Sequence, residues 1–491
     1  MTAAAPTALP DRFEAWFAGR GWAPRAHQLE MVEAGRAGQD TLLIAPTGGG
    51  KTLAGFLPSL IELTERPPAN APRGVHTLYI SPLKALAVDV ERNLMTPIAQ
   101  MGLPIVAESR TGDTGEARKQ RQRVKPPDIL LTTPEQLALF CAWEGARRYF
   151  EDLRCVVLDE IHTLWPSKRG DLLALDLARL QQFAPTLRRV GLSATVDDPD
   201  MIRDWLSTTD ASAVRLVRGP PGPLPEVDVL ISDGRVPWAG HTAQHAMAEV
   251  YEVIKRHRTT LIFVNTRFQA EFAFQELWKL NHDSLAIALH HGSLAAEQRR
   301  KVEAAMARGD LRAVVCTSTL DLGIDWGDVD LVIQLAAPKG ASRMVQRIGR
   351  ANHRLDEPSK AIFVPANRFE VLECQAAREA IAENAFDPEP PRIGALDVLA
   401  QHVMGCAVSE PFDMLALYDE VRTAGPYRDL SWEDFETVVE FVSTGGYALR
   451  TYDRFRRIVK TLDGLWTVRN AQTAQRHRMN VGAIVSPAVL S

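Results

Sequence analysis

The sequence Ala45-Pro46-Thr47-Gly48-Gly49-Gly50-Lys51-Thr52 directly follows the apolar run Thr41-Leu42-Leu43-Ile44. An apolar strand that leads through a glycine-rich turn into a helix is typical of a phosphate-binding loop. In such a loop the glycine N–H groups surround phosphate oxygens, the lysine meets the β- and γ-phosphates, and the hydroxyl of the last residue faces Mg²⁺. We therefore expect a nucleoside triphosphate to be bound by Thr47, Gly48, Gly49, Gly50, Lys51 and Thr52.

A second motif, Asp159-Glu160-Ile161-His162, ends the apolar run at 155–158. Two adjacent carboxylates at the end of a buried strand are costly unless a cation lies nearby. We expect Asp159 to hold Mg²⁺, directly or through water, and Glu160 to polarise an attacking water. Together, the two motifs favour triphosphate hydrolysis over a chance glycine-rich turn and a solvated strand end.

Composition limits the class of protein. The chain has 491 residues, 46% of them hydrophobic, which predicts a globular protein of two to four domains. Its net charge of -5 means that any nucleic-acid binding needs a local basic groove. The five cysteines are widely spaced and predict reduced core residues in a cytoplasmic protein. Neither a signal peptide nor a membrane-spanning apolar run is found, so we expect neither export nor membrane insertion.

Strand-like and helical segments alternate along most of the chain, which predicts an α/β fold with parallel sheets covered by helices. The expected strands of the first half are 76–80, 128–131, 155–158 and 190–192. Residues 218–225 hold four prolines and two glycines and predict a linker. Beyond it, strands are expected at 260–264, 285–289, 313–316, 331–335 and 361–364. The sequence thus predicts a second α/β domain without a phosphate loop of its own.

Several expected strands end in hydroxyl-bearing or cationic residues. Segments 81–86, 109–114 and 132–135 place such groups, a glycine or a helix N-terminus where a phosphodiester could dock. Each is also an ordinary helix-capping sequence, so capping is the alternative. The candidates for nucleic-acid contact in the first half are Ser81, Lys84, Thr111 and Thr133.

The second half has two further stretches of interest, at 317–326 and 346–354. The first, TSTLDLGIDW, follows a buried strand with hydroxyls, a glycine and a carboxylate. The second, QRIGRANHR, concentrates cations that suit a group crossing an interface to neutralise charge on a γ-phosphate. An exposed basic helix is the alternative. Upstream of the phosphate loop, the amide of Gln28 could both donate to and accept from an adenine edge.

The ordered set of motifs resembles superfamily 2 helicases. It comprises Gln28, APTGGGKT, SPLKAL, TTPE, DEIH, SAT, FVNTR, HHGSL, TSTLDLGIDW and QRIGRANHR. The DEIH form, the SPLKALAVD block and the QRIGRANH ending are similar to the Lhr (large helicase-related) family, especially its DNA-ligase-associated DExH-box branch. The resemblance covers essentially the whole chain.

This resemblance implies two RecA-like domains, at 1–212 and 226–386, joined by a linker at 213–225 and followed by a winged helix at 387–491. Three amphipathic helices at 393–407, 412–423 and 431–443 and a hairpin within 447–470 fit that third domain. Chains of this branch normally continue into a further large domain, and this sequence ends at Ser491. We therefore expect that domain to be absent.

The resemblance also implies functional roles. Gln28 would read adenine; Lys51, Thr52, Asp159 and Glu160 would hold and hydrolyse Mg-ATP; and Arg350 would reach the phosphates from the second domain. The further nucleotide contacts are Asp325, Arg347 and His353, and whether His353 or Arg354 completes the cationic finger stays open. Thr133, Arg267 and Thr317 would hold the strand backbone.

Relatives in this branch are DNA-dependent ATPases that translocate 3′ to 5′ on single-stranded DNA and unwind DNA or RNA:DNA duplexes. A role in DNA repair and association with an ATP-dependent DNA ligase and a nuclease are implied in the same way. Two alternatives have the same motifs. One is a translocase that remodels or strips strands without unwinding, and the other is a nucleic-acid clamp that binds ATP without hydrolysing it.

Overall fold

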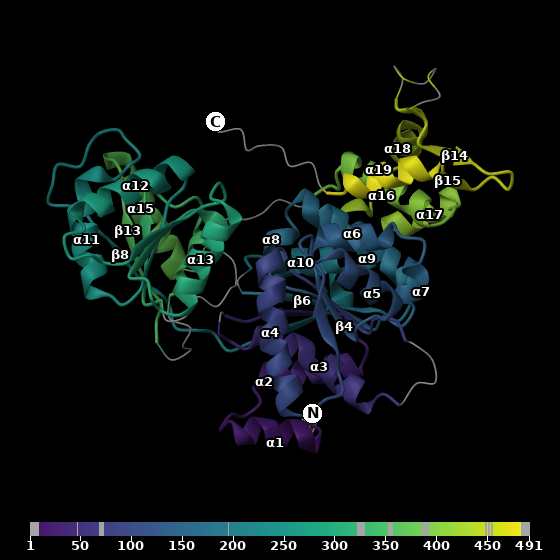
Figure 1. Cartoon of the computed structure of the whole chain (residues 1–491), viewed down its shortest axis with the longest axis horizontal. Helices are drawn as coiled ribbons and strands as arrows, with labels where there is room; N and C mark the ends of the chain where they lie inside the picture. The colour runs from purple at the N-terminus through teal and green to yellow at the C-terminus, as the bar shows by residue number, and fades with distance from the viewer. Residues whose placement is uncertain are drawn as a thin grey trace.

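The computed structural model describes residues 9–46, 48–67, 73–194, 196–321, 329–351, 357–383, 385, 392–446, 449, 452 and 455–482. Two α/β domains, each built on a parallel sheet, are followed by a smaller helical domain with a hairpin (Figure 1). The helical domain lies against the first α/β domain, close to α6 and α9. No helix in the described residues is long and apolar enough to span a membrane.

The first domain is centred on a sheet whose neighbouring strands all run parallel. In spatial order its strands are β3 (Ala107–Ser109), β4 (Ile129–Thr132), β2 (Thr77–Ile80), β5 (Cys155–Leu158), β6 (Arg188–Ser193), β1 (Thr41–Ile44) and β7 (Arg215–Arg218). Its helices are α1 (Asp11–Gly19), α2 (Ala26–Arg36), α3 (Lys51–Glu65), α4 (Lys84–Gln100), α5 (Glu116–Val124), α6 (Pro134–Cys141), α7 (Ala146–Phe150), α8 (Ile161–Leu164), α9 (Lys168–Phe183) and α10 (Pro199–Leu206).

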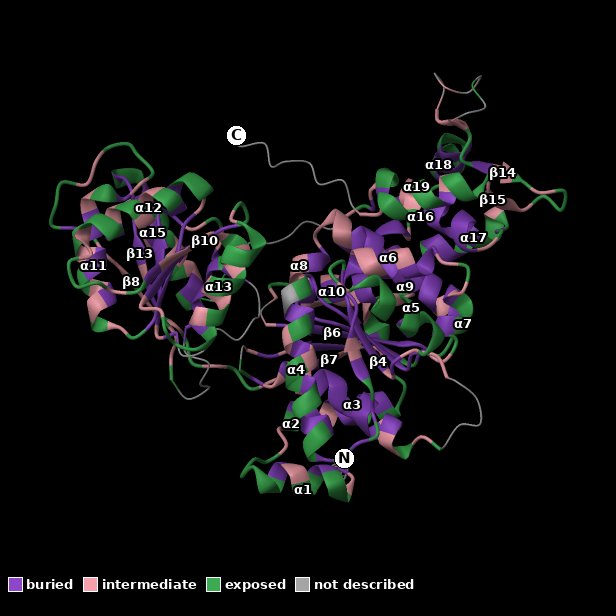
Figure 2. Cartoon of the chain, viewed as in Figure 1, coloured by how far each residue is buried: buried purple, intermediate pink, exposed green. Residues whose placement is uncertain are grey.

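Alternating side chains of these strands enter two different cores. Leu42 and Val156 pack on the face covered by α6 and α9, whereas Leu43 and Val157 pack on the face covered by α2, α3 and α4. Successive residues of a strand point to opposite faces, so a strand covered on both sides must be apolar throughout. The uninterrupted apolar runs in the sequence follow from this double burial, which Figure 2 shows as buried strands beneath half-exposed helices.

The second domain repeats this arrangement. Its strands, in spatial order, are β10 (Ile287–His290), β11 (Ala313–Cys316), β9 (Thr260–Phe263), β12 (Leu331–Leu335), β13 (Lys360–Val364) and β8 (Glu226–Val229). The helices are α11 (Met247–Arg256), α12 (Arg267–Leu280), α13 (Ala296–Ala307), α14 (Ala341–Ile348) and α15 (Arg368–Glu383). Parallel strands require such crossover helices, and both faces again hold apolar cores.

The third domain contains α16 (Leu396–Ser409), α17 (Met414–Arg422), α18 (Trp432–Thr444), the antiparallel hairpin β14 (Ile458–Lys460) and β15 (Trp466–Val468), and α19 (Ala471–Met479). Its apolar residues, among them Leu399 and Val403, join the core on one face of the first domain. Ion pairs surround that contact: Arg392 with Asp171, Arg428 with Asp204, and Lys168 with Asp397. Shared apolar burial and these pairs fix the third domain to the first.

The sequence predicted most of these elements. Every expected strand and the three helices of the third domain are present within a few residues of their expected bounds. Three strands were not predicted: β3, β7 and β8. Of these, β7 falls inside the range assigned to the linker, pairs with β1 and belongs to the first sheet, so the stretch without strand or helix before β8 is 219–225.

Candidate nucleotide and nucleic-acid site

The glycine-rich loop lies between β1 and α3, as the sequence predicted. Gly48 and Gly50 both have φ of 75°, in the left-handed region where a side chain is disfavoured. A Cβ on Gly49 would lie 2.7 Å from the carbonyl oxygen of Pro46. These glycines therefore give the loop a shape that bulkier residues could not adopt, as a close approach to phosphate requires. Thr47 lies outside the described residues.

Residues at the start of α2 contact the backbone carbonyls of this loop. The guanidinium of Arg25 donates to the carbonyl of Gly48 at 3.3 Å, and His27 Nε2 lies 3.0 Å from the carbonyl oxygen of Gly49. Gln28 is buried; its amide oxygen accepts from the Arg25 N–H at 2.9 Å, and its Nε2 faces Gly50. Its adenine role stays a prediction. Sequence reasoning missed Arg25 and His27, although they stand next to Gln28.

The two carboxylates follow β5, two strands from β1, with β6 between them. Asp159 accepts a hydrogen bond from the hydroxyl of the buried Tyr79 and, at 2.9 Å, from the N–H of Glu160. Glu160 has φ of 48°, which for a residue with a side chain is strained and is typical of functional sites. The structure therefore fixes both carboxylates at one sheet edge, beside the phosphate loop. Tyr79 carried no sequence signal, because its partner lies 80 residues away.

Burial and mutual repulsion govern the charges here. Burial, reinforced by Glu160, raises the pKa of Asp159 to about 6. Burial acts in the same direction on Glu160, but Lys51, His162 and Arg350 outweigh it and hold the pKa of that carboxyl below its ordinary value. Burial lowers the pKa of Lys51, although both carboxylates oppose the shift. The site thus holds one carboxyl whose pKa is lowered beside one whose pKa is raised.

Arg350 reaches this site from the second domain. It follows α14, is 3% exposed, and lies near enough for its charge to act on Lys51, Asp159 and Glu160. Arg347 behaves differently, since it donates to Asp321 at 2.8 Å and to Gln334 at 2.6 Å within its own domain. Its contact with nucleotide stays a prediction. Asp325, His353 and Arg354 lie outside the described residues.

The residues predicted to contact nucleic acid lie at the carboxyl ends of β3, β4 and β2 in the first domain. Thr111, Thr133 and Ser81 follow β3, β4 and β2, which are neighbours in the sheet. Ser81 Oγ donates to the Leu83 carbonyl at 3.0 Å, and the exposed Lys84 pairs with Asp113 at 3.1 Å. The structure therefore brings these residues to one edge, and a capping or turn role accounts for the Ser81 contact. Tyr79, on β2, connects these strand ends to the nucleotide site through its hydrogen bond to Asp159.

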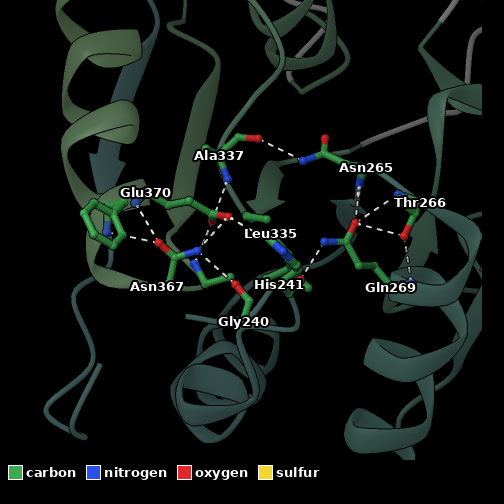
Figure 3. A network of polar contacts seen from close by, with 12 residues as sticks. Gly240, His241, Asn265, Thr266, Gln269, Leu335, Ala337, Asn367 and Glu370 are labelled. Carbon is green, nitrogen blue, oxygen red and sulfur yellow. Dashed lines mark hydrogen bonds and ion pairs between the residues drawn. The ribbon is translucent and has the colours of Figure 1, made fainter. Parts of the chain in front are cut away.

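In the second domain, Arg267 and Thr317 follow the neighbouring strands β9 and β11. Thr266 and Gln269 form a capping box at the start of α12, which leaves the side chain of Arg267 exposed. Gln269 also donates to the carbonyl of His241 at 2.5 Å. The segment is thereby held at the carboxyl edge of the sheet (Figure 3).

Glu370, on α15, holds the segments that follow β12 and β13 through hydrogen bonds. Its carboxylate accepts from the N–H groups of Ala337 and Ala366, both at 2.9 Å, and from the Asn367 amide at 3.2 Å. Asn265 in turn donates to the Ala337 carbonyl at 2.9 Å (Figure 3). This network fixes the turn that leads from β12 into α14, the helix that precedes Arg350. Sequence reasoning missed it.

The residues present fit Mg-ATP. Thr52 and Asp159 offer a hydroxyl and a carboxylate, which are the hard oxygen ligands that Mg²⁺ prefers. Lys51, directly after the glycine-rich loop, and Arg350, from the second domain, add two buried cations whose charges act on these carboxylates. Buried cations beside a glycine-rich loop suit a polyanionic ligand.

Three family models match the sequence. They describe a DEAD/DEAH box helicase over residues 25–202, a helicase conserved C-terminal domain over 245–354, and the winged-helix domain of large helicase-related protein over 379–491. The chain is 35% identical to the Lhr helicase/probable uracil glycosylase of Mycolicibacterium smegmatis, over 96% of this chain and 34% of that protein. It is also 35% identical to ATP-dependent helicase Lhr-Core protein 2 of Thermococcus barophilus, over 98% of this chain and 58% of that protein.

Solved structures agree with these relatives. The structure of Mycobacterium smegmatis helicase Lhr bound to ssDNA and AMP-PNP matches with a TM-score of 0.86 and 34% identity, covering 98% of this chain and 63% of that chain. The DUF1998 helicase MrfA bound to DNA matches with a TM-score of 0.71 at 22% identity and shows a shared fold. The chain thus spans between about one third and two thirds of the proteins described here.

Proposed function

This chain belongs to the Lhr family of superfamily 2 helicases, and on that premise we propose that it is an ATP-driven motor acting on nucleic acid. In this proposal it hydrolyses ATP, translocates 3′ to 5′ along single-stranded DNA, and unwinds DNA or RNA:DNA duplexes. The observation that supports it best is the position of Arg350, a buried cation of the second domain that acts on Lys51 and Glu160 of the first.

The proposed chemistry assigns one task to each group. Lys51 and Arg350 neutralise the charge that develops on the phosphates, from opposite domains. Cationic neighbours favour the ionised form of Glu160. Its carboxylate accepts a hydrogen bond from the attacking water and thereby orients that water. Thr52 and Asp159 would hold Mg²⁺, which would supply positive charge to the phosphates. Gln28 selects adenine.

Motion would follow from the same geometry. ATP draws the two domains together because it is bound by residues of both, and hydrolysis removes that link. Ser81, Lys84, Thr111 and Thr133 on one domain, and Arg267 and Thr317 on the other, would then hold the DNA backbone alternately. Contacts of this kind ignore base sequence and weaken with added salt.

Phosphate release measured with single-stranded DNA, RNA and duplex tests the motor directly. We expect single-stranded DNA to stimulate turnover and Lys51→Ala to abolish it. A wild-type chain that binds DNA and releases no phosphate would instead be the clamp. Strand displacement on duplexes with a 3′ or a 5′ tail tests unwinding and polarity. Displacement from the 5′ tail alone would contradict the proposed direction, and translocation without displacement would favour a strand remodeller.

The cellular setting is a further part of the proposal. We propose that the protein works in the cytoplasm in DNA repair, with an ATP-dependent DNA ligase and a nuclease as partners, on the strength of the family branch that its motifs resemble. Co-purification of the tagged chain with a ligase from its own cells tests this. Recovery of the chain without either enzyme, under conditions that preserve DNA binding, would count against those partners.

A further inference from the structure

A cluster of buried polar side chains lies far from the site described above, where the third domain meets the first. His402 and Cys406 stand four residues apart on α16 and therefore face the same direction. His402 Nε2 lies 3.5 Å from Cys406 Sγ and 4.0 Å from Oε1 of Glu420, on α17. The three atoms lie within 4.8 Å of one another, and all three residues are buried.

These atoms have the separation of metal ligands. With bonds of about 2.0 to 2.3 Å, neighbouring ligand atoms of a tetrahedral Zn²⁺ lie about 3.3–3.7 Å apart. The nitrogen and sulfur already have this spacing, and a small rotation of the Glu420 side chain would bring its oxygen closer. A small cavity lined by Cys141, Asp176 and His477 adjoins His402 and Cys406 and could hold a water as fourth ligand.

The cluster is also short of positive charge. Oε1 of Glu420 and Oδ2 of Asp176, on α9, are buried and have no hydrogen-bond partner among the residues that the structure describes. Buried carboxylate oxygens without a donor or cation are costly. Arg179 supplies a guanidinium, but it donates to the other oxygen of Glu420 and to Glu410. Oε1 of Glu420 lies 4.0 Å from His402 Nε2 and within 4.8 Å of the thiol, so a cation between these atoms would supply the partner that this oxygen lacks.

The surrounding groups would hold the ligands in the required orientation. Asp176 Oδ1 lies 3.7 Å from His402 Nδ1, on the side of the ring away from Cys406. Histidines that bind metal commonly donate their second ring N–H to a carboxylate, which leaves the other nitrogen free to coordinate. Arg179 Nη1 fixes Glu420 Oε2 at 2.9 Å in a comparable way. Both supporting residues come from α9 of the first domain.

We propose that His402, Cys406 and Glu420 form a site for a thiophilic divalent cation, with Zn²⁺ as the expected ion. The site would stabilise the third domain against the first, because its ligands lie on α16 and α17 and their supporting groups on α9. A cysteine, a histidine and a carboxylate are a ligand set that suits Zn²⁺ better than Mg²⁺. The proposal does not depend on the motor activity.

Cobalt binding to the intact, chelator-treated chain tests the proposal. Co²⁺ bound to a thiolate gives an intense near-ultraviolet absorption that Co²⁺ on oxygen ligands alone lacks, so binding at the ATP site is not mistaken for it. We expect this absorption at one equivalent of Co²⁺, its displacement by Zn²⁺, and its loss in Cys406→Ser and His402→Gln. Cys374→Ser, which removes a buried cysteine of the second domain, is the matched control and should retain it.

Asp176→Asn separates a site from a plain polar core. It leaves all three ligands in place and should weaken Zn²⁺ binding by about 10- to 100-fold through loss of the carboxylate that orients His402. The wild-type spectrum decides the question even if a ligand variant fails to fold. Absence of the thiolate absorption in the folded wild-type chain with excess Co²⁺ would mean that Cys406 only donates a hydrogen bond to His402, and the proposal would be wrong. Unchanged absorption in Cys406→Ser would equally overturn it.

Discussion

Replacement of Glu370 by alanine tests whether the second domain depends on one buried carboxylate. Glu370 accepts from the backbone N–H groups of Ala337 and Ala366 and from the side chain of Asn367. All these groups are buried. The alanine variant removes the shared acceptor and leaves three donors without it.

The size of the effect follows from that count. A buried donor left unpaired costs about 1–3 kcal/mol. Three donors therefore predict a loss of about 3 kcal/mol or more, even if water reaches some of them. Glu373→Ala is the matched control, because it removes an exposed carboxylate from the same helix, and surface changes of this kind usually stay within about 0.5 kcal/mol.

Unfolding in guanidinium chloride measures the stability of the second domain by itself when it is followed by the fluorescence of Trp238 and Trp278. The other tryptophans of the chain are replaced by phenylalanine for this purpose. We expect the midpoint to fall clearly for Glu370→Ala and to stay in place for Glu373→Ala. Because the same network positions the turn before α14, the ATPase rate should fall with it. If both variants unfold at the same denaturant concentration, the network does not stabilise this domain and the reasoning is refuted.

Three further predictions concern other residues. Lys51→Ala should abolish ATP hydrolysis while DNA binding, measured by fluorescence anisotropy, changes little; DNA-stimulated turnover at the wild-type rate would contradict its assignment. Glu160→Gln should retain nucleotide binding and lower the hydrolysis rate by about 10²- to 10⁴-fold, the usual contribution of a general base, and a rate within a factor of ten would argue against that role. Burial, reinforced by Arg66, Arg188 and Arg154, lowers the pKa of His76 to about 3, so the unfolded chain takes up a proton below about pH 6.5 before the folded chain does. The free energy of unfolding should therefore decrease as the pH is lowered below about 6.5, by about 2 kcal/mol at pH 5. In His76→Gln, the decrease between pH 7 and pH 5 should be smaller by that amount. Equal decreases in the two proteins would contradict the prediction.

The sequence predicted the features that depend on residues close together in the chain, namely the strands and the motifs at their carboxyl ends. The apolar runs that end in Gly, Asp or Thr marked the strands and the sheet edge where both halves of the site lie. Doubly buried strands are apolar throughout, and residues at the carboxyl ends of parallel strands meet at one edge whatever lies between them in sequence. Asp159, Lys51 and Thr133 could therefore be assigned to that edge without coordinates.

Sequence reasoning missed what depends on distant partners. Tyr79 sits inside an apolar strand and has nothing to distinguish it from a core residue until Asp159 is seen beside it. The edge strand β7 has only two apolar residues, Leu216 and Val217, before the proline-rich segment, so it was assigned to the linker. The sequence has a run of basic residues at 118–125, mostly within α5, and the fold neutralises part of its charge, since Arg118 and Arg121 pair with Glu108 of β3. Because Glu108 lies on a separate strand, the sequence alone does not show this pairing.

In the proposed motor, ATP is hydrolysed between two domains, and the second of them supplies Arg350. The most direct measurement compares the kcat and KM for ATP of Arg350→Ala, with single-stranded DNA present, against Arg343→Ala, a half-exposed arginine of the same region. We expect a fall in kcat of at least about 10³-fold for Arg350→Ala, little change in its KM, and near-normal values for Arg343→Ala. An Arg350→Ala variant with a wild-type kcat would contradict it.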